Sequence, residues 1–131
     1  MRFHWSGLSL ALLFAFSASA ASQEAQETEV VFPQQMNAND LLTLCASSSL
    51  TTKGRSRRKY CDGFVSGIEE GMRLYRLRYR IESAAAICVP EGTTARVMTQ
   101  TFLRHASSKG VDLSQPAAAV VLTALHDGFP C

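Results

Sequence analysis

Four cysteines limit the folds that are open to this chain of 131 residues: Cys45, Cys61, Cys88 and Cys131. All four lie downstream of a secretory signal pattern, so we expect them to meet an oxidising compartment in which thiols pair. Their number is even, and no Cys-x-x-Cys spacing favours the alternative of a zinc site. We therefore expect two disulfides, no bound metal and no cofactor.

The first twenty residues predict export. Arg2 and His4 precede an apolar run over residues 8–16, and Ala18-Ser19-Ala20 matches a cleavage site. The run is much shorter than the roughly twenty residues that span a bilayer. We expect cleavage near Ala20 and no stable membrane anchor afterwards. Residues 21–36 lack a sustained helical period, which predicts a flexible segment before a single domain over residues 37–131.

Apolar periods within that domain predict an all-α fold, a compact bundle of about four helices. The first helix is expected to have Asn39 as its N-cap and to end where a Ser-, Thr- and Gly-rich stretch begins at Ser47. The third is expected to be capped by Thr93 or Thr94 and to end within residues 107–110. The fourth is expected to be capped by Ser114.

The second helix has the clearest period. Its apolar side chains recur at steps of three and four residues, which predicts one buried face: Tyr60, Phe64, Ile68, Met72, Tyr75 and Tyr79. Beside them, Gly63, Gly67 and Gly71 recur at every fourth residue. Each internal Gly costs a helix up to about 1 kcal/mol relative to Ala. We therefore expect another helix to approach this strip closely.

Four cysteines allow three connectivities, and the order of the helices favours one of them. If short connections make neighbouring helices antiparallel, Cys45 at the end of the first helix lies near Cys61 at the start of the second. The end of the fourth helix likewise brings Cys131 to Cys88. Cys61 and Cys88, by contrast, flank the second helix and would lie roughly 35 Å apart, far beyond the ~7 Å that a disulfide spans.

The net charge of +2 gives no general attraction for nucleic acid or for a membrane surface. The charge is nevertheless uneven, because a basic connection is expected before the second helix and a basic stripe of Arg73, Arg76 and Arg80 along it. Such a surface is either simply solvated or docks an acidic protein, since Arg is favoured at interfaces. Two exposed polar segments are the candidates for partner contact: Arg55, Arg57, Arg58 and Lys59, and Ser107, Ser108 and Lys109.

No catalytic site is expected. His105 and His126 are the histidines downstream of the signal pattern, and both lie near expected helix ends, where a solvated role is ordinary. The cysteines are already assigned to disulfides, so no Cys-His nucleophile is indicated. Two alternatives remain open: a small hydrolase that uses one of the histidines, and an exported chaperone or envelope-stress protein with an exposed apolar patch.

Four segments in this order resemble the Rap/Tai immunity-protein family: LLTLC (41–45), YCDGFVSG (60–67), ICVPEGTT (87–94) and FPC (129–131). The resemblance implies a small periplasmic helical protein with two disulfides, often a homodimer. It also implies that the protein binds a peptidoglycan amidase delivered by type VI secretion and blocks it by obstruction, without catalysis. The basic segment 53–59 and the Arg-rich second helix depart from the family pattern, so the resemblance leaves the partner unidentified.

Overall fold

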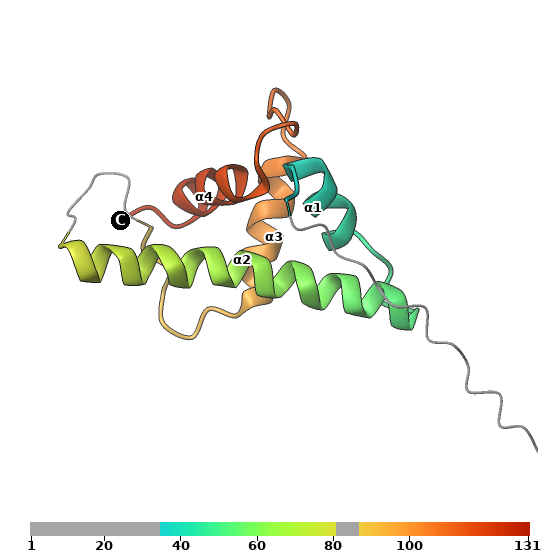
Figure 1. Cartoon of the computed structure of the whole chain (residues 1–131), viewed down its shortest axis with the longest axis horizontal. Coiled ribbons are helices and arrows are strands. Elements are labelled where there is room, and N and C mark those ends of the chain that lie inside the picture. Colours follow the sequence, from blue (N-terminus) through green and yellow to red (C-terminus); the bar gives the residue numbers. More distant parts are fainter. Residues whose placement is uncertain (1–34, 81–86) are drawn as a thin grey trace, which may run out of the picture.

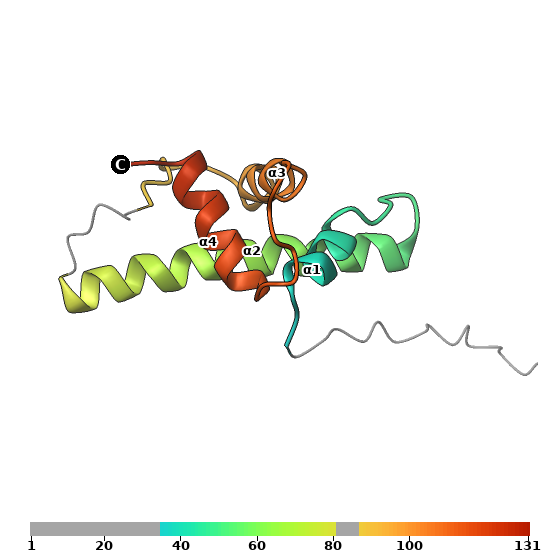
Figure 2. The same cartoon turned by 90° about the horizontal axis from the view of Figure 1, so that it is seen from above.

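Four α-helices make up the part of the chain that the computed structural model describes, residues 35–80 and 87–131. They are α1 (Ala38–Cys45), α2 (Thr52–Tyr79), α3 (Ala95–Ala106) and α4 (Ala117–Gly128). The long helix α2 runs along the molecule, and the three shorter helices pack against it (Figure 1, Figure 2). Within these ranges, β-type pairing is limited to two isolated bridges. The predicted all-α fold is confirmed.

The expected signal peptide over residues 1–20 lies outside the described residues, as does most of the expected flexible segment over 21–36. In the part of the chain that is described, no helix is both long enough and apolar enough to span a bilayer. All four helices fall within the expected domain over residues 37–131.

The start of α1 is fixed by a capping box. The side-chain oxygen of Asn37 accepts a hydrogen bond from the N–H of Asp40 at 2.9 Å, and the Asp40 carboxylate accepts one from the N–H of Asn37 at 3.2 Å. The prediction that Asn39 is the N-cap is therefore wrong. Asn37 has an acidic side chain three residues later, whereas Asn39 has Leu42 at that place.

The start of α2 also differs from the prediction, because the helix begins at Thr52 and not near Tyr60. The hydroxyl of Thr51 accepts a hydrogen bond from the N–H of Gly54 at 3.0 Å and so caps the helix. The first turns are rich in Lys and Arg, which are good helix formers but leave no apolar period to detect. The prediction of a basic connection is wrong: Arg55, Arg57, Arg58 and Lys59 are helical.

The buried face of α2 is centred on Cys61 and Val65, which are fully buried, and the predicted face lies at the edge of the contact. The predicted members at positions 60, 64, 68 and 72 are half-buried. Tyr75 and Tyr79 are 50% and 63% exposed, because the C-terminal end of α2 extends past the other helices (Figure 1). The prediction that these two tyrosines are buried is wrong.

The glycine strip of α2 faces open space among the described residues. A Cβ built at Gly63, Gly67 or Gly71 would meet no atom within 4 Å. The prediction that another helix of the chain packs on this strip is therefore wrong. The close approaches in the fold occur at other glycines.

The rest of the core lies between α3 and α4, where Phe102 and Leu125 are fully buried. Gly128, the last residue of α4, permits this contact, because a Cβ there would clash with the methyl group of Thr101. Thr94 caps α3 through its hydroxyl, and Thr94 is one of the two residues predicted for this role.

The start of α4 is closed by the main chain. The N–H of Ala117 donates to the carbonyl oxygen of Met36 at 3.1 Å, and the N-cap position is held by Pro116 without a side-chain hydrogen bond. The prediction that Ser114 caps α4 is wrong, because its hydroxyl donates instead to the Asp112 carboxylate at 2.6 Å.

Two disulfides join the helix junctions. Cys45 is bonded to Cys61 and Cys88 to Cys131, with Cα atoms 5.2 Å and 5.0 Å apart. These are the two pairs that the helix order predicts. The first bond ties the end of α1 to α2, and the second ties the segment before α3 to the residue that follows α4. No cysteine is free.

Candidate partner-binding surfaces

The first candidate surface is the α1–α2 corner, by which we mean residues 46–59, the loop after α1 and the first two turns of α2 (Figure 2). It contains the four basic residues that the sequence predicts as partner contacts. Arg55 and Lys59 are exposed, whereas Arg57 and Arg58 are half-buried. The corner contains five Lys and Arg residues and no Asp or Glu, so its surface is positively charged.

Arg55 holds the loop of this corner in place. Its guanidinium donates to the carbonyl oxygens of Ser49 and Leu50, both at 3.4 Å, and to the hydroxyl of Thr52 at 3.0 Å. Since these hydrogen bonds occupy both terminal nitrogens, Arg55 orders the loop in addition to supplying charge. From the sequence, only a contact role was predicted for Arg55.

Leu50 was missed as a functional candidate. Its side chain is 89% exposed, and the loop that carries it is otherwise made of Ala, Ser and Thr. An apolar residue within a Ser- and Thr-rich stretch is visible in the sequence. Its exposure at the end of an ordered loop is evident only from the structure.

The second predicted segment, Ser107 to Lys109, follows α3. The hydroxyls of Ser107 and Ser108 donate back to the carbonyls of Leu103 and Arg104 at 2.8 Å and 3.0 Å. Both serines therefore use their donors to finish the helix, and Lys109 is the exposed charge of the segment. Figure 1 and Figure 2 both place this loop away from the α1–α2 corner, so the two predicted segments do not form one surface.

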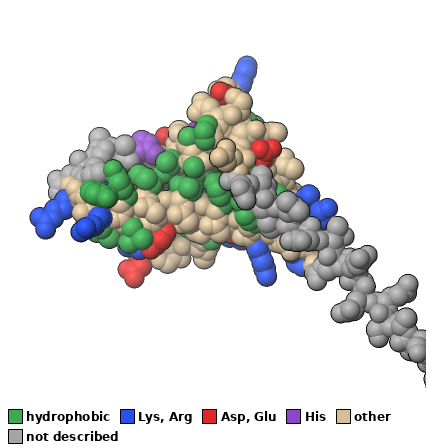
Figure 3. All heavy atoms as spheres, viewed as in Figure 1, with side chains coloured by type: hydrophobic (Ala, Val, Ile, Leu, Met, Phe, Trp, Pro, Cys, Tyr) green, Lys and Arg blue, Asp and Glu red, His purple; other side chains and the backbone are tan. Residues whose placement is uncertain are grey.

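The predicted basic stripe on α2 is divided between different contacts. Arg73 forms an ion pair with Glu70 at 2.6 Å, and Arg76 donates to the carbonyl oxygen of Ile87 at 3.1 Å. The same stretch of α2 carries exposed apolar side chains: Leu74, Tyr75, Leu77 and Tyr79. Figure 3 shows hydrophobic side chains at the surface over α4 and the C-terminal half of α2, with Lys and Arg side chains beside them.

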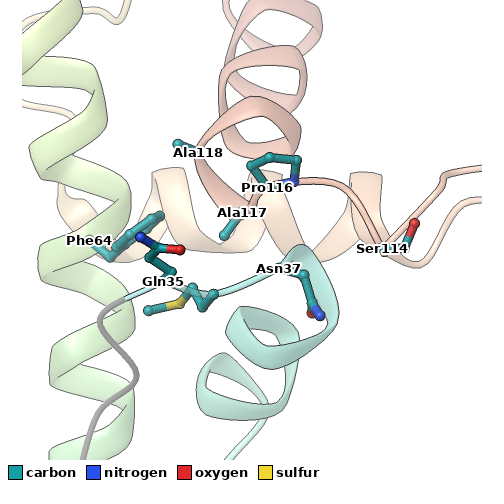
Figure 4. A pocket seen from close by; sticks show the side chains of 8 residues that line it. Gln35, Asn37, Phe64, Ser114, Pro116, Ala117 and Ala118 are labelled. Atoms are coloured by element: carbon teal, nitrogen blue, oxygen red, sulfur yellow. The ribbon is translucent and has the colours of Figure 1, made fainter.

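An open groove of about 540 Å³ lies between α2, the start of α4 and the segment that enters α1 (Figure 4). Phe64 and Gln35 line one side, and Pro116, Ala117 and Ala118 line the other. None of its lining residues is titratable. The groove therefore offers shape and apolar surface, without groups for proton transfer.

Both histidine candidates lie against one carboxylate. The Nδ1 atoms of His105 and His126 lie 3.6 Å and 3.2 Å from the oxygens of Asp127, at the C-terminal ends of α3 and α4. All four cysteine sulfurs are in disulfides, so neither histidine is paired with a thiol nucleophile. Among the described residues, no group of His, Cys, Asp and Glu could hold a metal ion.

A model of the Rap1a immunity proteins matches residues 37–131 of the chain. No curated protein and no solved structure matches it. The matched range contains all four helices, both disulfides and each of the surfaces described above except Gln35 and Met36 at the groove. The chain therefore belongs to the family of Rap1a immunity proteins.

Proposed function

We propose that this protein is an exported immunity protein that binds a peptidoglycan amidase delivered by type VI secretion and blocks it without catalysis. The observation that carries the proposal is the family match over residues 37–131, which spans the whole helical domain. An immunity protein neutralises a toxin by binding it. Consistent with this, all four cysteines are in disulfides, and no residue that lines the groove is titratable. The signal pattern of residues 1–20 supports action in the periplasm.

We place the principal contact at the α1–α2 corner. Its positive charge, with Lys53, Arg55 and Lys59 exposed, would steer an acidic partner toward it. Ser107, Ser108 and Lys109 are a secondary contact, because they lie on a separate part of the surface. The half-buried Arg57 and Arg58 would contribute mainly through the long-range field of the corner.

The test uses the disulfide-bonded protein from residue 21 onward and each type VI peptidoglycan amidase encoded in the same genome. We expect one amidase to bind with a Kd of about 1 nM or below and to lose its activity at a one-to-one ratio. The association rate should fall with ionic strength, because steering by exposed charge is screened. If no amidase binds, or if a bound amidase keeps its activity, the proposal fails.

The proposal includes a homodimer. Leu74 and Tyr79 expose apolar surface on the part of α2 that extends past the other helices, where a second copy would cover it. Light scattering after gel filtration should give twice the mass of one chain. A monomer at all concentrations would contradict the dimer. A monomer that also suppresses aggregation of many unfolded proteins would favour the chaperone alternative.

A further inference from the structure

We propose that Leu50 is the anchor that enters an apolar pocket on the amidase partner, and that Arg55 positions it. This inference rests on the proposed function and names the residues through which binding would occur. An exposed leucine on its own is ordinary on protein surfaces. Leu50 is unusual because the loop that carries it is held by hydrogen bonds, by packing on α2 and by a disulfide.

Hydrogen bonds fix the loop on both sides of Leu50. The N–H of Leu50 donates to the hydroxyl of Ser48 at 3.2 Å, and its carbonyl oxygen accepts from Arg55 at 3.4 Å. Arg55 also binds the carbonyl oxygen of Ser49, and the Thr51 hydroxyl caps α2 directly after the loop. The backbone on either side of the exposed side chain is therefore held by side chains of the same corner.

Packing and a covalent bond fix the base of the loop. Gly54 is buried, and the carbonyl oxygen of Ser48 lies where its Cβ would be, so the loop rests directly on the backbone of α2. The Cys45–Cys61 disulfide joins the helices on which the loop begins and ends. None of these interactions uses the side chain of Leu50, which is left 89% exposed.

A loop that is already ordered loses little conformational entropy when it binds, so an apolar side chain on it contributes nearly its full burial to affinity. The side chains that dominate binding cluster near the centre of a contact, and the groups around them exclude water. Around Leu50 those groups are serines, threonines and cations, including Lys53 and Arg55. The fitting partner is therefore a protein with an apolar pocket and an acidic rim.

Two other partners fit less well. A second copy that docked through the same corner would bring two positively charged surfaces together, because the corner has no acidic residue. A bilayer of anionic lipid would attract the charges. Stable membrane anchoring, however, requires two signals, such as a lipid chain and a polybasic patch. A single leucine buries far less apolar area than a lipid chain does.

The experiment compares Leu50→Ala and Leu50→Asp with Val97→Ala and Val97→Asp in titration against the amidase bound by the unaltered protein. Val97 is a suitable control because it is also apolar and 44% exposed, and it lies on α3 away from the corner. We expect Leu50→Ala to raise Kd about 10- to 100-fold and Leu50→Asp to raise it further. The thermal midpoints of the Leu50 variants and the Kd of the Val97 variants should remain unchanged.

A second pair of variants tests the positioning role. Arg55→Lys keeps the charge and loses the planar guanidinium, which donates to the carbonyl oxygens of Ser49 and Leu50 through one nitrogen and to the Thr52 hydroxyl through the other. Arg96→Lys, at an exposed position on α3 outside the corner, is the control. We expect Arg55→Lys to raise Kd about 3- to 10-fold and to speed hydrogen exchange of the Leu50 amide. If Arg55 contributed charge alone, Arg55→Lys would bind as the unaltered protein does.

The outcomes separate the two proposals. If the unaltered protein binds no amidase, the proposed function fails and this inference fails with it. If it binds one and the Leu50 variants bind equally well, the inference alone is overturned. Phosphatidylglycerol vesicles provide the lipid comparison: vesicle binding that Leu50→Asp abolishes, with amidase binding unchanged, would also overturn it.

Discussion

Gly54 illustrates how one residue without a side chain holds two segments together. The carbonyl oxygen of Ser48 lies where a Cβ at position 54 would be, so the α1–α2 loop rests against the backbone of α2. We expect Gly54→Ala to lower the free energy of unfolding by about 1–3 kcal/mol, because the added methyl must displace main chain. Urea denaturation measures this loss. An unchanged unfolding midpoint would show that the loop moves away without a penalty.

Asp112 gives a prediction that depends on pH. Hydrogen bonds from the hydroxyl and the N–H of Ser114 hold the pKa of Asp112 below its ordinary value. A carboxyl group whose pKa is lower in the folded state stabilises the fold above its unfolded pKa, and this contribution is lost as the pH falls through the folded pKa. In Ser114→Ala we expect the pKa of Asp112 to rise, as measured by NMR titration of its side-chain carboxyl carbon. A pKa that does not change would mean that the N–H of Ser114 and the side chain of Gln115 account for the lowered value.

At the scale of whole helices, α2 shows which features can be predicted from the sequence and which cannot. The four-helix fold and both disulfide pairs follow from apolar periods and helix order. The start of α2 could not be predicted in this way. Its first turns are stabilised by the Thr51 cap and by the packing of Gly54, and neither produces an apolar period in the sequence. The positive charge of the α1–α2 corner is also evident in the sequence, although its cations were expected in a connection and four of them, Arg55, Arg57, Arg58 and Lys59, proved to be helical. Local patterns could not predict the hydrogen bonds of Arg55 to the loop or the exposure of Leu50. Both depend on how the loop folds back onto α2.

The glycine strip of α2 gives a prediction of its own. A methyl group at Gly63, Gly67 or Gly71 would meet no described atom within 4 Å, so in a free helix it would only reduce the freedom of the unfolded chain. We expect Gly67→Ala to raise the free energy of unfolding by up to about 1 kcal/mol, as measured by urea denaturation. Gly54→Ala is the internal control with the opposite sign. A destabilised Gly67→Ala variant would indicate that a second molecule packs on the strip.

At the scale of the whole molecule, the two disulfides have different tasks, although both join helix junctions. Cys45–Cys61 spans 16 residues and encloses the loop that carries Leu50. Cys88–Cys131 spans 43 residues and fastens the segment before α3 to the residue after α4. Loop entropy predicts contributions to stability of about 3 kcal/mol for the shorter span and about 4 kcal/mol for the longer. The ordering of the candidate contact, by comparison, depends mainly on the shorter one.

We therefore expect removal of one disulfide to affect mainly stability and removal of the other to affect mainly amidase binding. Replacing Cys88 and Cys131 by Ser should lower the free energy of unfolding more than the same change at Cys45 and Cys61, as measured by urea denaturation. Amidase affinity, measured where both variants are folded, should show the reverse order, because only loss of Cys45–Cys61 frees the base of the Leu50 loop. Hydrogen exchange of the loop amides should rise in that variant alone. If both variants lost affinity equally, the partner would recognise the whole helical scaffold rather than one preordered corner.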